Sequence, residues 1–199
     1  MKQTIVPPNK SVRQTHLSRL YFLSKGCKQV PLESTGGKVL WANGNEGYFM
    51  SAYGVKLTLS FGPAMRKKGK KANNDKRGLI HPIMSYYRNC LAHRLMFGTF
   101  ADDPCPIYFD SKGNPYKGVV HHVIENHYDL RMANLMGWLT YKQHAIADKR
   151  RRALEQILPD MYCVETEYLK RIQDPRRTDD TSFEKELNNL RATYGKDNL

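Results

Sequence analysis

The stretch of residues 118–152 restricts the fold of this chain more than any other part of it. An apolar run there ends in two adjacent histidines, His121 and His122, and a polar segment and a second short apolar run follow. Short apolar runs bounded by turn-forming residues are typical of strands. The pattern therefore predicts a strand that ends in the histidine pair, a loop, and a second strand over residues 136–139.

A helix is predicted directly after the second strand. Thr140 and Gln143 have the spacing of a capping box, in which the side chain of each residue binds the backbone N–H of the other. The helix should span residues 141–158, because the proline that follows cannot continue it. His144 would then lie in the first turn, beside the strand that carries the histidine pair.

These residue types suit a metal-assisted cut of a phosphodiester bond. Such a cut needs a base that activates water and a cation that neutralises charge on the phosphate. Neighbouring side chains on a strand point to opposite faces, so His121 and His122 are expected to differ in role, one as metal ligand and one as base. His144 can complete the metal site, and the amide of Asn134 can bridge the loop and keep the histidines oriented.

The net charge of +13 is the strongest signal in the composition, and it favours nucleic acid as a polyanionic partner. No apolar run is long enough to cross a membrane and no signal peptide is recognised, so we expect a cytoplasmic, intracellular protein without a membrane partner. The four cysteines are far apart and form no CxxC pair, so they are expected to be reduced thiols rather than a zinc site.

The N-terminal part, residues 1–64, is predicted to form a small β-rich module. A short helix is expected over residues 18–25. Within residues 38–61, short apolar runs are separated by turn-forming residues such as Asn43, Gly44 and Asn45, a pattern typical of hairpins in a small antiparallel sheet.

A basic segment, residues 65–78, follows this module and is dense in lysine and arginine. Like charges at this density oppose packing, so the segment is either a solvated loop or a loop that orders against phosphates, and the net charge favours the second. Residues 149–152 lie two turns along the predicted helix, where they either meet a DNA backbone or form a solvated face. The residues assigned to phosphate contact are Arg66, Lys67, Lys68, Lys70, Lys71, Lys149, Arg150, Arg151 and Arg152.

The remaining chain divides into residues 79–158 and a C-terminal helical region, residues 159–199. The first part should begin with a strand over residues 79–84 and a helix over residues 86–100. The second should hold a helix over residues 161–173 and another from about residue 182, where Thr181 and Glu184 have capping-box spacing.

Three residues near the histidines are given ordinary structural roles. His93 lies within a predicted helix, and a lone helical histidine is usually a hydrogen-bonded core or surface residue rather than a ligand. His127 is expected to be a solvated loop residue. Trp138 is expected to anchor the core.

Residues 118–152 resemble the HNH endonucleases, or His-Me finger family, and in particular their phage and intron homing members. That family has an HRL motif, a histidine pair or its equivalent, Asn-Leu, an aromatic or apolar strand, Thr, and a final Asn or His. The matching residues are His93-Arg94-Leu95, His121-His122, Asn134-Leu135, Trp138, Thr140 and His144. The segment from Trp41 to Gly54 is also similar to a small module often found ahead of HNH domains, so the resemblance covers about residues 38–152.

The resemblance implies an α+β fold: a small β-rich N-terminal module, a ββα-metal finger within a nuclease domain at residues 79–158, and C-terminal helices. It implies His122 as the general base, His121 and His144 as metal ligands, and Asn134 as the structural asparagine of the catalytic set. One divalent ion would be the cofactor. The family favours Mg²⁺ or Mn²⁺, whereas two imidazoles with no carboxylate beside the base also suit Zn²⁺ or Ni²⁺.

The implied function is metal-dependent hydrolysis of double-stranded DNA, as a nick or a double-strand cut, by a homing-type enzyme that phages encode in bacterial hosts. The first alternative is a non-catalytic DNA-binding protein that keeps the finger as a scaffold, and the second is an RNA-binding protein with a structural metal. The intact histidine set argues against a scaffold, which needs no base.

The spacing from Asn134 to Trp138 is one residue longer than in the family, which predicts a bulge at Gly137. The C-terminal helices either contact DNA or serve packing or dimerisation.

Overall fold

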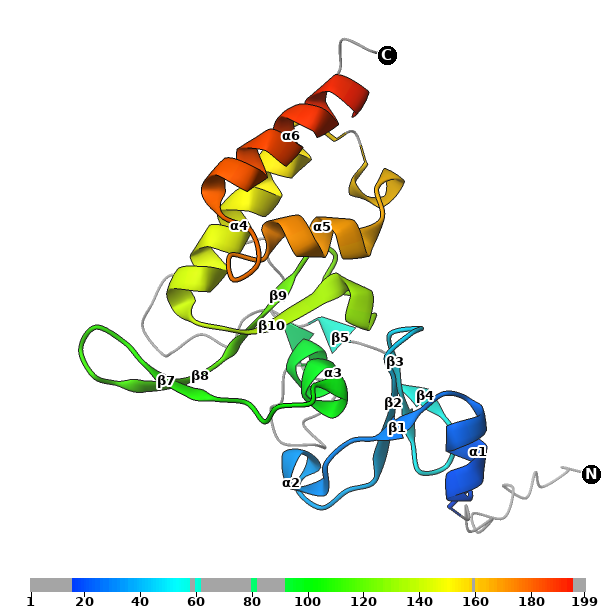
Figure 1. Ribbon diagram of the computed structural model, residues 1–199. Coiled ribbons are helices and arrows are strands. Elements are labelled where there is room, and N and C mark those ends of the chain that lie inside the picture. Colours follow the sequence, from blue (N-terminus) through cyan, green and yellow to red (C-terminus); the bar gives the residue numbers. More distant parts are fainter. Residues whose placement is uncertain (1–15, 58–59, 62–79, 82–91, 159, 195–199) are drawn as a thin grey trace, which may run out of the picture.

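The computed structural model in Figure 1 describes residues 16–57, 60–61, 80–81, 92–158 and 160–194. It combines helices with small antiparallel sheets, which confirms the α+β class. The basic segment at residues 65–78 lies outside the described residues, so its assignment stays a prediction. No helix within the described part of the chain has the length and apolar character that a membrane crossing needs.

The N-terminal module contains a four-stranded antiparallel sheet, in the order β1 (Lys28–Gln29), β2 (Leu40–Asn43), β3 (Tyr48–Ser51) and β4 (Lys56–Leu57). The predicted turn joins β2 to β3, where the Asn43 side-chain oxygen accepts hydrogen bonds from two backbone N–H groups of the turn. The predicted short helix is α1 (Arg19–Ser24), and a second short helix, α2 (Leu32–Thr35), was not predicted.

A helix joins this module to the histidine region. The structure describes α3 (Ala92–Phe100), which is part of the helix predicted over residues 86–100. Of the strand predicted before it, the structure describes β6 (Ile80–His81), and β6 pairs with β5 (Ser60–Phe61). Leu95 and Met96 of α3 are buried in one cluster with residues of the module and of the histidine region. The two parts of the chain therefore share a hydrophobic core.

A hairpin precedes the histidines and projects from the body of the molecule (Figure 1). Its strands are β7 (Ile107–Phe109) and β8 (Pro115–Lys117). Asp110 closes the turn by accepting hydrogen bonds from the backbone N–H groups of Lys112 and Asn114, both at 2.8 Å.

The predicted strand–loop–strand–helix unit is present. It consists of β9 (Val119–His122), the short 3₁₀ helix η1 (Met132–Asn134), β10 (Leu135–Leu139) and α4 (Tyr141–Glu155). Strands β9 and β10 are antiparallel, and their register shifts between Met136 and Leu139, which confirms the predicted bulge. A Cβ atom on Gly137 would lie 3.0 Å from side chains of Phe97 and Val120, so little more than a glycine fits there.

Both halves of the predicted capping box are formed at the start of α4. The Gln143 N–H donates to Thr140 Oγ1 at 3.2 Å, and the Thr140 N–H donates to Gln143 Oε1 at 2.9 Å. The helix ends at Glu155, before the predicted residue 158. Trp138 on β10 is only partly buried, where it packs edge-on against Phe97 at a centroid distance of 5.2 Å.

The C-terminal region has the short 3₁₀ helix η2 (Met161–Cys163), α5 (Thr166–Gln173) and α6 (Asp180–Tyr194). The single helix predicted over residues 161–173 is therefore interrupted, at extended Val164. Helix α6 begins earlier than predicted, and the Ser182 N–H donates to the side chain of Asp179, not of Thr181. Figure 1 shows α6 running beside α4, and a common cluster joins α4, α5 and α6 to residues of β10 and of the loop directly after β9.

Candidate functional site

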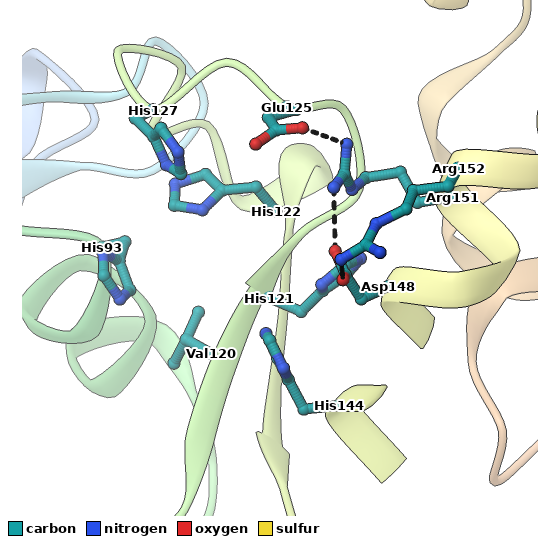
Figure 2. A pocket seen from close by; sticks show the side chains of 10 residues that line it. All are labelled: His93, Val120, His121, His122, Glu125, His127, His144, Asp148, Arg151 and Arg152. Carbon is teal, nitrogen blue, oxygen red and sulfur yellow. Dashed lines mark hydrogen bonds and ion pairs between the residues drawn. The ribbon is translucent and has the colours of Figure 1, made fainter. Parts of the chain in front are cut away.

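Five histidines gather in one pocket of about 480 Å³ beside β9 and α4 (Figure 2). They come from α3, from β9, from the loop after β9 and from the first turn of α4. Two carboxylates and two arginines complete the wall with one valine. The residues that line the pocket are His93, Val120, His121, His122, Glu125, His127, His144, Asp148, Arg151 and Arg152.

The structure brings the two predicted metal ligands together. The rings of His121 and His144 are edge-to-face, with centroids 5.2 Å apart. Two imidazoles on one ion, with metal–nitrogen distances of about 2.1 Å, place their ring centroids roughly 4.5–5.5 Å apart. One ion can therefore bridge this pair without a large rearrangement.

Both imidazoles are in the state that binds metal. Burial, and next the neighbouring His144, lower the pKa of His121 to about 4. Burial also lowers the pKa of His144. Each ring is therefore neutral at neutral pH and has a lone pair on one nitrogen.

A carboxylate lies beside this pair, although none is adjacent to the histidines in the sequence. Asp148 is on the same face of α4 as His144, four residues later, and that spacing is the signal that sequence reasoning missed. Its oxygens accept hydrogen bonds from Arg151, at 2.8 Å, and from Arg152. Burial alone would raise the pKa of Asp148, but the hydrogen bond and charge of Arg151 outweigh it and hold the pKa below its usual value.

The pocket lining is not a ready-made metal cage. Within the described residues, no group of three or more His, Cys, Asp or Glu side chains is arranged to hold a metal ion. The described cysteines, Cys27, Cys105 and Cys163, are free thiols and do not line this pocket. An ion at His121 and His144 would therefore complete its coordination with water or phosphate oxygens.

His122, the predicted base, is packed between two other histidines. Its ring lies edge-to-face on His93 and on His127, at centroid distances of 5.0 and 4.8 Å. His127 is in the loop after β9 as predicted and is only partly buried, with its ring against His122, and His93 lines the pocket from α3. The ring nitrogens His122 Nε2 and His93 Nδ1 are buried and have no hydrogen-bond partner among the described residues.

This packing keeps His122 uncharged. Burial, and then the two neighbouring imidazoles, lower its pKa to about 2. Burial likewise lowers the pKa of His93 to about 4. A neutral imidazole keeps one nitrogen with a lone pair that can accept a proton.

Asn134 bridges the loop as predicted, but it does not line the pocket. Its side chain is fully buried, and its oxygen accepts a hydrogen bond from the Ile124 N–H at 2.7 Å. Its amide nitrogen donates to the carbonyl oxygens of Ile124, at 3.3 Å, and Asp129, at 3.1 Å. Asn134 is therefore a positioning residue that shapes the loop directly after the histidine pair.

The basic run at residues 149–152 is split between different surroundings. Arg150 is only 4% exposed, and its guanidinium donates to the Thr178 carbonyl at 2.9 Å and to Asp180 at 2.7 Å. The assignment of Arg150 to phosphate contact is therefore wrong, because this side chain ties α4 to the start of α6. Lys149 is exposed, Arg152 is exposed at the pocket, and Arg151 is buried in the pocket wall.

Arg151 is held by three carboxylates. It donates to Glu125 at 2.5 Å, to Asp148 at 2.8 Å and to Glu155. Figure 2 shows the first two of these contacts at the edge of the histidine cluster. The loop after β9 and the middle of α4 are thus joined by one ion-pair network.

A residue from the C-terminal region also contacts the site. Gln173, at the end of α5, lies within hydrogen-bonding distance of His121. No feature of the sequence relates these residues, which are far apart in the chain.

No protein-family model, no curated protein and no solved structure matches this chain.

Proposed function

We propose that the protein is a divalent-metal-dependent endonuclease of the HNH type, which hydrolyses phosphodiester bonds of double-stranded DNA in one strand or in both. The observation that carries this proposal is the pocket itself. It combines two neutral imidazoles 5.2 Å apart with a third neutral imidazole, His122, on the same strand end. These are the parts that a metal-assisted hydrolysis needs, and their order in the sequence resembles that of the homing members of the family.

The residues present fit one divalent ion held by His121 and His144. Such an ion would neutralise charge on the scissile phosphate and on the leaving oxygen. Two imidazoles suit Mn²⁺, Ni²⁺ or Zn²⁺, whereas the water and phosphate oxygens that would complete the coordination are donors of the kind that Mg²⁺ and Mn²⁺ prefer. Mn²⁺ is therefore the ion that this set of side chains suits best.

His122 is the residue that takes the proton from the attacking water. In the free protein its low pKa makes it a weak base, although it is uncharged and ready to accept a proton. A phosphodiester in the pocket brings a negative charge close to the ring, and a nearby negative charge favours imidazolium. DNA binding should thus raise the pKa of His122 towards a useful value at the moment when a base is required.

Charge favours DNA as the partner. The chain has 32 lysines and arginines against 19 acidic residues, and Arg152 lies at the pocket. A polyanion gains affinity from each phosphate that a cation neutralises. The alternative of a non-catalytic DNA-binding scaffold is favoured by one observation, which is that Asp148 and Glu125 are both bound to Arg151 instead of being free for a metal.

The test compares three proteins on DNA: the wild type, His122→Ala and the control His16→Ala, which removes an exposed histidine at the start of the described chain. Supercoiled plasmid and a duplex library of randomised sequence are incubated with Mg²⁺, Mn²⁺ or EDTA. The wild type and His16→Ala should cut only with metal. His122→Ala should lose roughly 10²–10⁴ in rate, as expected for loss of a general base, with DNA affinity unchanged.

Two results would contradict the proposal. Near-normal cutting by a folded His122→Ala protein would remove the base assignment. Tight DNA binding by the wild type without any metal-dependent cut in the library would favour the scaffold alternative.

A further inference from the structure

The side chain of Gln173 connects a C-terminal helix to the candidate metal ligand His121. Gln173 is the last residue of α5 and is fully buried. Its Nε2 lies 3.1 Å from the carbonyl oxygen of Val123, and its Oε1 lies 3.3 Å from His121 Nε2. A single amide thus touches both the ligand on β9 and the backbone just after it.

These two contacts fix the direction of the amide. The carbonyl of Val123 can only accept a hydrogen bond, so the NH₂ group of Gln173 must face it. The amide oxygen then necessarily faces His121, and an amide oxygen can only accept. The proton of this contact must therefore come from the histidine, which places a hydrogen on His121 Nε2.

The other nitrogen of the His121 ring is then the one with a lone pair. A neutral imidazole has one N–H and one acceptor nitrogen, so a proton on Nε2 leaves Nδ1 unprotonated. The two ring nitrogens point away from each other, so Nδ1 is turned away from α5. No described residue forms a hydrogen bond with Nδ1, and the neighbouring ring is that of His144, at a centroid distance of 5.2 Å.

We propose that Gln173 is a positioning residue that holds His121 in the Nε2–H tautomer and so presents Nδ1 to a divalent ion shared with His144. The role of the ion rests on the proposed function, whereas the tautomer is a property of the metal-free protein. Metal-binding histidines commonly donate their second N–H to an oxygen, and loss of that oxygen typically lowers metal affinity 10–100-fold.

The backbone at Gln173 is held independently of its side chain. The next residue, Asp174, is ion-paired with Arg176 at 2.7 Å, and Arg176 also donates to the carbonyl of Gly137 in the β10 bulge at 3.0 Å. Ile172, the preceding residue, is buried in the shared core. A side-chain substitution at Gln173 should therefore leave α5 in place.

The experiment uses Gln173→Met, which keeps the shape but loses both hydrogen bonds, and Gln173→Glu, which keeps an acceptor for His121. Gln156→Met, at an exposed glutamine after α4, is the matched control. Long-range ¹H–¹⁵N NMR of the metal-free, ¹⁵N-histidine-labelled full chain reports the tautomer of His121. Calorimetric titration with Mn²⁺ and with Zn²⁺ alone reports the metal affinity.

The wild type, Gln173→Glu and Gln156→Met should show the Nε2–H form of His121. Gln173→Met should show a mixture of tautomers and a 10–100-fold weaker metal affinity. A wild-type His121 protonated on Nδ1, or a Gln173→Met protein with unchanged tautomer and affinity, would overturn the inference. If the wild type has the expected tautomer and binds metal but never cuts DNA, the proposed function fails and the role of Gln173 stands.

Discussion

Replacing Asn134 with alanine is expected to destabilise the protein by about 2–6 kcal/mol. The amide forms three hydrogen bonds in the interior, but they do not count equally. The Ile124 carbonyl keeps a second partner, the Asn126 N–H, at 2.6 Å. The Ile124 N–H and the Asp129 carbonyl lose the partner that Asn134 gives them, and each such group costs about 1–3 kcal/mol when it is left unpaired inside a protein.

Urea unfolding followed by circular dichroism measures this loss of stability. A domain with a free energy of unfolding of about 5–15 kcal/mol would remain mostly folded after the substitution, so the difference can be measured. Asn189→Ala, at an exposed position of α6, is the control and should change stability by no more than about 0.5 kcal/mol. Cleavage by Asn134→Ala should fall because the loop after β9 moves, since Asn134 does not line the pocket.

The reasoning would be refuted by an Asn134→Ala protein as stable as the Asn189→Ala control. It would also be refuted if the NMR signals of the His121 and His122 rings were unchanged while cleavage was lost, because the amide would then act directly in catalysis. A stable variant with intact cleavage would mean that the loop keeps its shape without the asparagine.

Three further predictions concern charge. Burial lowers the pKa values of His93, His121 and His122 to about 4, 4 and 2, so the unfolded chain binds protons below pH 6.5 that the folded protein does not. The free energy of unfolding should therefore be unaffected by these groups above pH 6.5, and each group should lower it by roughly 1 kcal/mol per pH unit as the pH drops towards 4. Urea unfolding at a series of pH values measures this, and a free energy of unfolding that does not change with pH would contradict it. Arg150→Met should cost about 1–3 kcal/mol in the same assay but leave DNA affinity unchanged, since the buried guanidinium cannot reach a phosphate. Replacing the four lysines of residues 66–71 with alanine should flatten the slope of log affinity against log salt by about 0.9 for each lost phosphate contact, and an unchanged slope would mean a solvated linker.

The sequence by itself determined the local elements around the pocket. The start of α4 follows from Thr140 and Gln143, because a capping box is closed between near neighbours. The histidine pair at the end of β9 follows from a short apolar run, whereas the bulge at Gly137 was predicted from a spacing one residue longer than in the family that the segment resembles. Each of these features depends on interactions within a few residues, which is the range over which a pattern in one sequence is informative.

Only the tertiary structure decided which side chains meet. It buried Arg150 of the basic run against Asp180, and it packed the rings of His93 and His127 against the same imidazole, that of His122. It also brought Gln173 to a strand that precedes it by about fifty residues. These contacts arise because the apolar faces of α4, α5 and α6 are buried together against β10 and the loop after β9. Hydrophobic attraction is non-directional, so the order of residues alone does not specify which faces meet.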